Sequence, residues 1–183
     1  MAESYPTLDD AAIENIVAAS LAEASLDGQR MLVLVPDLTR TIPLPLFARL
    51  IVRHARLRAQ SVDFLVALGT HPPLDDEAMN QLFGMTPQER SSLFADVSFL
   101  NHDWKNPGRL VQLGSISSAE VERISGGLLH MEIPVLINRL VLDYDVLLVC
   151  GPVFPHEVAG FSGGTNTSFQ GFLGLRLSMR RTG

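Results

Sequence analysis

The chain has 183 residues, an apolar fraction of 46% and a formal net charge of −6, values that fit one globular domain with a sizeable core. The acidic balance argues against a nucleic-acid surface. The amino terminus lacks the apolar stretch of a secretory signal, and no apolar run is long enough to span a bilayer, so we expect a cytoplasmic protein without a membrane partner. A single cysteine, Cys150, excludes an intrachain disulfide and predicts a packed thiol.

Helical and strand periodicity alternate along the chain. In chain order the pattern predicts a helix over 8–26, a strand over 31–35, a helix over 43–58, a strand over 62–68, short helices that open at Leu74 and at Thr86, strands over 97–100 and 109–113, a short helix over 118–124, and strands over 134–138 and 145–150. This alternation with short connections predicts an α/β fold that is Rossmann-like, with a largely parallel sheet and flanking helices.

Polar residues follow three of the predicted apolar strands. They are Asp37, Thr39 and Arg40 after the first, Gly69, Thr70 and His71 after the second, and a loop with His156, Ser162, Gly163 and Gly164 after the last. In open α/β sheets the ligand crevice lies at the carboxyl ends of the strands. Small residues let backbone N–H groups approach an anionic ligand, and histidine titrates near neutral pH. The pattern therefore predicts a ligand site at this edge.

Each of these groups also has an ordinary structural interpretation. Asp37 and Thr39 would cap the helix that follows, Arg40 would form a surface ion pair, and His71 would be a turn residue. The glycine loop would be a tight turn beside a partly buried histidine. Because polar residues follow all three strands, a shared ligand site is a better explanation than three unrelated structural roles.

The three strand ends resemble, in the same order, motifs of the nickel-dependent lactate racemase family. The amino-terminal domain of that family carries an Asp-x-Thr-Arg strand end, a Gly-Thr-His strand end and a Pro-His-x-x-x-Gly-Phe-Ser-Gly-Gly loop, which here are residues 37–40, 69–71 and 155–164. The resemblance predicts a racemase-like domain over 1–164 and a divergent tail over 165–183. Asn101-His102-Asp103-Trp104 also looks like a family segment, with His102 expected to be structural.

The resemblance implies an isomerase that removes a hydride from a small 2-hydroxy acid and returns it on the opposite face. His71 and His156 would be the two acid/base catalysts, because imidazole accepts and returns a proton near neutral pH. The expected substrate-binding residues are Arg40, Asp37 and Thr39, of which Arg40 would bind the substrate carboxylate and Asp37 would also orient Arg40 or the cofactor. The implied hydride acceptor is a nickel-pincer nucleotide tethered through a lysine. The residues expected to contact that cofactor are Thr70, Ser162, Gly163 and Gly164. Composition and spacing by themselves indicate no nickel and no metal ligand.

Two positions depart from the family pattern. Asn166 stands where the family has the tethering lysine, and Thr182 stands where it has a nickel-binding histidine. Asn166 has no amine, and Thr182 is a poor nickel ligand. The sequence also stops without a second domain, so we expect a truncated chain that does not racemise by itself. A frameshift would explain the tail, because synonymous codons exist for which a frame two bases later encodes lysine at position 166 and histidine at position 182.

Three interpretations stay open at this stage. The first is the racemase-like domain with a frameshifted or genuinely divergent tail. The second is a non-catalytic domain that binds a carboxylate or phosphate through Arg40 and the loop that ends at Gly164. The third is a partner-dependent subunit, in which another polypeptide supplies the missing carboxyl-terminal domain in trans.

Overall fold

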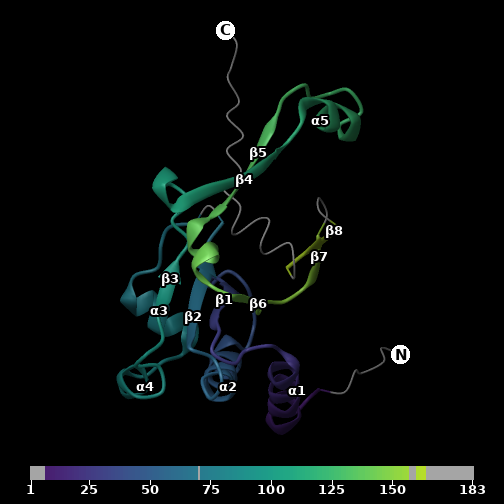
Figure 1. Ribbon diagram of the computed structural model, residues 1–183. Helices are drawn as coiled ribbons and strands as arrows, with labels where there is room; N and C mark the ends of the chain where they lie inside the picture. The colour runs from purple at the N-terminus through teal and green to yellow at the C-terminus, as the bar shows by residue number, and fades with distance from the viewer. Residues whose placement is uncertain (1–6, 70, 157–159, 164–183) are drawn as a thin grey trace, which may run out of the picture.

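A four-stranded parallel sheet forms the centre of the molecule, in the order β3-β2-β1-β6 (Figure 1). The computed structural model describes residues 7–69, 71–156 and 160–163. The strands are β1 (Arg30–Pro36), β2 (Ser61–Ala67), β3 (Phe99–Asn101) and β6 (Val146–Val149). All three pairings between them are parallel. The prediction of a Rossmann-like α/β fold with a largely parallel sheet is confirmed.

The helices are α1 (Asp10–Glu23), α2 (Leu44–Ala55), α3 (Asp76–Phe83), α4 (Pro87–Ser91) and α5 (Ser118–Ile124). Side-chain caps precede α1, α3, α4 and α5, whereas α2 begins after Pro43 without one. Asp75 accepts the Ala78 N–H at the start of α3, and Thr86 and Glu89 form a reciprocal capping box at α4. The predicted helices over 8–26 and 43–58 are present but shorter at both ends.

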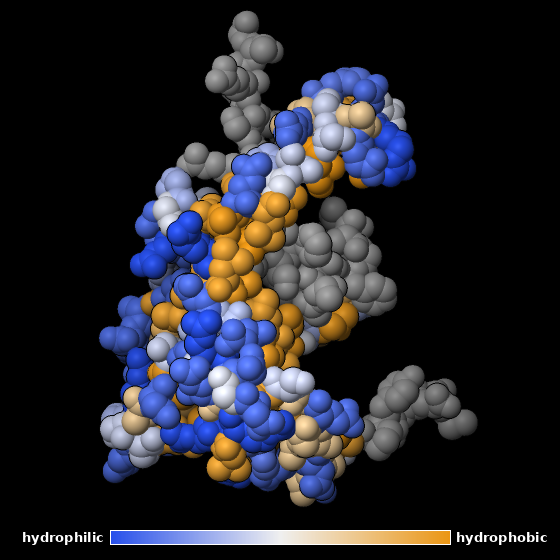
Figure 2. All heavy atoms as spheres, viewed as in Figure 1, coloured by the Kyte–Doolittle hydropathy of each residue, from blue (hydrophilic) through white to orange (hydrophobic). Residues whose placement is uncertain are grey.

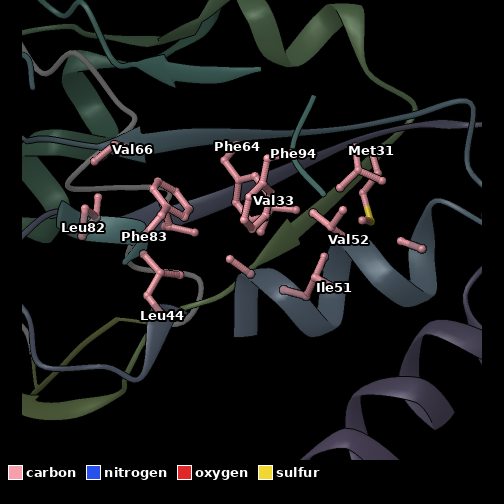
Figure 3. Packing of buried hydrophobic residues seen from close by; sticks show 14 of the residues in the cluster. Met31, Val33, Leu44, Ile51, Val52, Phe64, Val66, Leu82, Phe83 and Phe94 are labelled. Carbon is pink, nitrogen blue, oxygen red and sulfur yellow. The ribbon is translucent and has the colours of Figure 1, made fainter. Parts of the chain in front are cut away.

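Both faces of the sheet are packed, which explains why its strands are almost continuously apolar. On one face, the side chains of Val33, Phe64 and Val66 join the main core with residues of α2 and α3 (Figure 3). Phe64 packs edge-on against Phe83, with ring centroids 5.1 Å apart. On the other face, a smaller cluster gathers Leu32, Leu34, Leu65 and Ile137.

Two predicted strands lie outside the parallel sheet. β4 (Leu110–Ile116) and β5 (Ile133–Asn138) pair antiparallel with each other and form a ribbon that leads away from the sheet, with α5 near its outer end (Figure 1). Periodicity predicts both strands but not their separate sheet. A parallel strand needs burial on both faces, whereas β4 exposes most of its length, including Leu113.

Past β6 the chain forms a second antiparallel pair, β7 (Phe154–His156) with β8 (Gly160–Ser162). The face shown in Figure 2 is largely hydrophilic but carries a band of hydrophobic residues near the middle. Within the residues that the structure describes, no helix has both the length and the apolar character needed to cross a membrane.

Candidate functional site

Asp37 follows β1 directly and is 6% exposed. One of its carboxylate oxygens, Oδ1, accepts the Thr39 hydroxyl at 2.6 Å and the Thr39 N–H at 3.0 Å. The alternative in which these residues cap the next helix is wrong, because the N-cap of α2 is Pro43 and no side chain bonds there. Thr39 instead helps to hold the Asp37 carboxylate in place.

His71 follows β2 and meets the same carboxylate. Its Nδ1 atom contacts Oδ2 of Asp37, while the imidazole side chain is 53% exposed. The backbone reaches this position through a turn in which the His71 N–H donates to the Leu68 carbonyl at 3.0 Å. Gly69 in that turn has φ +59°, a conformation that glycine adopts without steric cost. The parallel register of β1 and β2 brings the two strand ends together.

Asp37 is ionised at neutral pH. Its burial works to raise the pKa, but hydrogen bonds from Thr39 and His71 outweigh that effect and lower the pKa below the ordinary value of an aspartic acid. An ionised carboxylate can only accept hydrogen bonds. The proton in the Asp37–His71 contact therefore belongs to Nδ1 of His71. In the neutral ring, Nε2 is left as the nitrogen that can accept a proton from a ligand.

Arg40 lies on the same strand end as Asp37. Its N–H donates to the Asp37 carbonyl at 3.3 Å, and its side chain is exposed. Among the described residues, the Arg40 guanidinium has no hydrogen bond or ion pair, so neither a surface ion pair nor an orienting contact from the Asp37 side chain is present. A guanidinium without such a partner, on the strand end that carries Asp37, is suited to a carboxylate ligand.

The end of β3 contributes a buried histidine instead of an exposed one. His102 is 1% exposed, and its Nδ1 lies 2.9 Å from Nδ2 of Asn138. Oδ1 of Asn138 accepts the Leu140 N–H, so Nδ2 is the donating amide nitrogen and Nδ1 of His102 accepts. Burial lowers the pKa of His102, and nearby Asp103 opposes that effect only in part. These features agree with the expected structural role of His102.

Asn101 is a residue that sequence reasoning did not assign to the site. Its side chain accepts the Leu74 N–H at 3.0 Å and donates to the Leu74 carbonyl at 2.8 Å. Leu74 lies three residues after His71, in the same loop. The contact joins residues 27 positions apart, so only the parallel pairing of β2 with β3 reveals it.

The third predicted strand end is described mainly by its backbone. His156 pairs with Gly160 across β7 and β8, and Ser162 ends β8. Gly163 has φ +92°, and a Cβ at this position would overlap the carbonyl oxygen of Pro152, so only glycine fits. The roles of these residues stay predictions. Thr70, Gly164 and the tail over 165–183 lie outside the described residues.

The residues present do not fit a covalently tethered nickel group. Within the described ranges, nowhere do three His, Cys, Asp or Glu side chains gather as metal ligands. Cys150 packs against the main core as predicted, and burial raises the pKa of its thiol to about 11, so it offers no thiolate at neutral pH. Asn166 and Thr182 occupy the positions where the resemblance implies the tether and a nickel ligand.

The fold and the strand-end site define a Rossmann-like α/β domain with a histidine–carboxylate pair at the carboxyl edge of its sheet. The chain belongs to the family of the lactate racemase N-terminal domain, which matches residues 4–176. The family and fold predictions are thereby confirmed. The match continues past Gly164, and the domain boundary placed there remains a prediction.

Two relatives illustrate the similarity. The chain is 27% identical over 168 residues to a lactate racemase from Thermoanaerobacterium thermosaccharolyticum, covering 90% of this chain and 35% of that protein. It also resembles the crystal structure of a Thermotoga maritima protein, with a TM-score of 0.78 and 28% identity over 91% of this chain and 39% of the other. The chain thus spans little more than a third of the length of either relative.

Proposed function

We propose that this domain binds a small 2-hydroxy acid at the carboxyl edge of its sheet and exchanges a proton with the hydroxyl group of that acid. The observation that carries the proposal is the contact between His71 and the buried, ionised Asp37. Family membership supports lactate or a close analogue as the ligand. The domain would then supply the acid–base part of a racemase, an isomerase acting on hydroxy acids.

Each residue has a definite part in this proposal. Arg40 binds the substrate carboxylate through a charge-assisted pair, which its guanidinium is free to form among the described residues. His71 accepts the hydroxyl proton at Nε2, while Asp37 stabilises the imidazolium that results. Thr39 holds Asp37 through its hydroxyl group. His156 would serve the opposite enantiomer in the same way.

The proposal stops at binding and proton exchange. Inversion at the substrate carbon also requires a hydride to leave and return, and the resemblance assigns that task to a nickel-pincer nucleotide. Asn166 and Thr182 do not fit the tether and the nickel ligand, so the proposed function includes no hydride transfer. The chain as written is expected to bind the hydroxy acid without racemising it.

Calorimetric titration with L-lactate, D-lactate and propionate tests this function. Both lactates should bind, and propionate, which lacks the hydroxyl, should bind more weakly. Arg40→Ala should weaken lactate binding by at least about tenfold, because a hydrogen bond to a charged group contributes roughly 1.5–3 kcal/mol. Arg53→Ala is the matched control, since Arg53 lies on α2 and pairs with Glu14. Absence of lactate binding, or equal effects of the two substitutions, would refute the proposal.

The same titration separates the competing interpretations. Binding of inorganic phosphate that competes with lactate, and that survives His71→Ala unchanged, would favour a non-catalytic anion-binding domain. Racemisation of L-lactate by the isolated chain, followed with an enantiomer-specific dehydrogenase assay, would contradict the expected inactivity. Racemisation that appears only with a second polypeptide would favour the partner-dependent subunit.

The origin of the tail is tested at the level of DNA. Sequencing from the codons of Phe161 onward should reveal a shifted frame with lysine at position 166 and histidine at position 182, if the frameshift hypothesis is right. Confirmation of the printed frame would make Asn166 and Thr182 genuine residues, and the tail would then be a real divergence from the family pattern.

A further inference from the structure

We propose that Asn101 is a positioning residue for His71 and that it acts through the Pro72-Pro73 pair between them. The inference concerns the geometry of His71 and rests on the proposed function only for the catalytic meaning of that histidine. Asn101 ends β3, next to β2, where its backbone pairs with Val66. From there its side chain reaches the loop that carries His71.

The Asn101 side chain makes two hydrogen bonds with the backbone of one residue, Leu74. Oδ1 of Asn101 accepts the Leu74 N–H at 3.0 Å, and Nδ2 donates to the Leu74 carbonyl at 2.8 Å. A side-chain amide offers both an acceptor and a donor, whereas a carboxylate only accepts and an aliphatic side chain does neither. The Leu74 side chain also packs against the main core, so Leu74 is fixed from two directions.

The two prolines make the backbone between Leu74 and His71 stiff, so that fixing Leu74 also restricts the position of His71. Each proline ring fixes φ near −65°, and a residue before proline is restricted to extended conformations. These restrictions apply to His71, Pro72 and Pro73, so few backbone torsions can adjust between the anchored Leu74 and the Cα atom from which the imidazole extends. Proline also lacks an N–H, which makes the Leu74 amide the first backbone donor after His71.

The opposite side of His71 is held independently. Its N–H donates to the Leu68 carbonyl at 3.0 Å, and its Nδ1 contacts Asp37. The imidazole is thus placed between a turn at the end of β2 and the two hydrogen bonds that Asn101, at the end of β3, makes with Leu74. We call these two hydrogen bonds the clamp. Release of the clamp should let the 53% exposed ring leave Asp37, because solvent is available as an alternative partner.

Long-range proton–nitrogen correlation spectra of the imidazole rings test this directly. The chain has five histidines, so the His71 signals are assigned by their absence in His71→Gln. In the unsubstituted protein His71 should be the tautomer protonated at Nδ1. In Asn101→Ala the fraction of that tautomer should fall toward that of a solvent-exposed histidine, and exchange of the Leu74 amide should accelerate by at least about tenfold.

Two further variants separate positioning from a general loss of structure. Asn101→Asp keeps the acceptor for the Leu74 N–H but loses the donor, so its effect on His71 should be intermediate. The matched control is Asn80→Ala, which removes an amide that accepts from Arg90 on the same side of the sheet and should leave the His71 signals unchanged.

The double substitution Pro72→Gly with Pro73→Gly tests the link itself. It should reproduce the His71 tautomer change while the Leu74 amide stays protected, and adding Asn101→Ala should then change the His71 signals no further. A folded Asn101→Ala protein with unchanged His71 signals would overturn the proposal. The proposal would also fail if the triple variant changed the His71 signals by the sum of the changes seen in Asn101→Ala and in the double glycine variant. If Asn101→Ala does not fold, the Asn101→Asp and double-glycine spectra decide by the same criteria.

This experiment needs no ligand, so its outcome is distinguishable from that of the lactate titration. Failure of lactate to bind would refute the proposed function and leave the clamp intact. Unchanged His71 spectra in the folded variants would refute the clamp and leave the binding proposal standing.

Discussion

The ends of β2 and β3 each deliver a histidine, yet the two side chains have opposite surroundings. His71 is 53% exposed and meets the ionised carboxylate of Asp37, whereas His102 is 1% exposed and meets the neutral amide of Asn138. A carboxylate partner stabilises the protonated ring, and an amide donor occupies the very nitrogen that a proton would need. The first arrangement suits proton exchange and the second suits a fixed, neutral core.

The difference shows that the position after a strand does not by itself make a histidine functional. β2 and β3 are neighbours and parallel, so both histidines emerge at the same edge of the sheet. The β5 end and the turn after it cover His102, because Asn138 and Leu140 lie there. Nothing comparable among the described residues buries the His71 ring. The partner and the degree of burial decide the role.

The largest expected effect is on stability. His102→Ala should lower the free energy of unfolding by about 2–4 kcal/mol, because it leaves a cavity and a buried Asn138 amide without its acceptor. His71→Ala should lower it less, by about 0.5–1.5 kcal/mol, because the exposed ring leaves no cavity and the Asp37 carboxylate keeps its hydrogen bonds from Thr39. Urea unfolding of both variants at pH 7.5 measures the contrast. Similar losses in the two variants would mean that the histidines do not differ as described.

A second test uses pH and concerns His102 alone. Its pKa is lowered in the folded state, so the unfolded chain binds more protons below the ordinary histidine value of about 6.5. The stability that neutral His102 contributes is therefore complete above that pH and is lost progressively as pH falls toward the lowered pKa. The free energy of unfolding that His102 contributes should change with pH at a slope that approaches but does not exceed about 1.4 kcal/mol per pH unit.

Urea unfolding between pH 7.5 and pH 5 measures this slope, and the window lies above the titration of Asp37. His102→Gln should flatten it, because an amide does not titrate, while His71→Gln should retain the His102 contribution. The remaining histidines are common to both variants and cancel in the comparison. A slope that persists in His102→Gln would assign the pH dependence to other groups.

The sequence predicted much of this arrangement, for physical reasons that can be named. Runs of apolar residues buried on both faces identify parallel strands, and Asp75 and Thr86 identify helix starts by their capping chemistry. Asp37 and His71 could be placed at one edge because parallel strands end together. What the sequence could not show were contacts between distant residues, namely Asn101 with Leu74 and His102 with Asn138.

The separate ribbon was likewise invisible to periodicity. β4 and β5 have the composition of strands, but which strand they pair with depends on where the chain turns back. Local sequence fixes the strand and not its partner. The same limit explains why Thr39 was expected to cap a helix, when its hydroxyl in fact bonds Asp37 two residues earlier.

The smallest expected effect concerns that hydroxyl. Thr39→Val should lower stability by about 0.5–1.5 kcal/mol at pH 7, because Asp37 loses its hydroxyl donor, and it should raise the pKa of Asp37 toward the ordinary value. Thr39→Ser keeps the hydroxyl and is the matched control.

The sign of the pH dependence identifies the cause. The pKa of Asp37 is lowered in the folded state, so its contribution is present above the ordinary value of about 3.9 and is lost as pH falls through the folded pKa. The deficit of Thr39→Val should therefore be full at pH 7 and shrink as pH falls below the ordinary value and Asp37 takes up a proton, which a comparison of pH 7 with pH 3 measures. A deficit that stays constant between these pH values, measured by urea unfolding, would attribute it to packing of the valine. In that case the ionised Asp37 would owe little to Thr39, and the contact with His71 would become the main interaction that stabilises its charge.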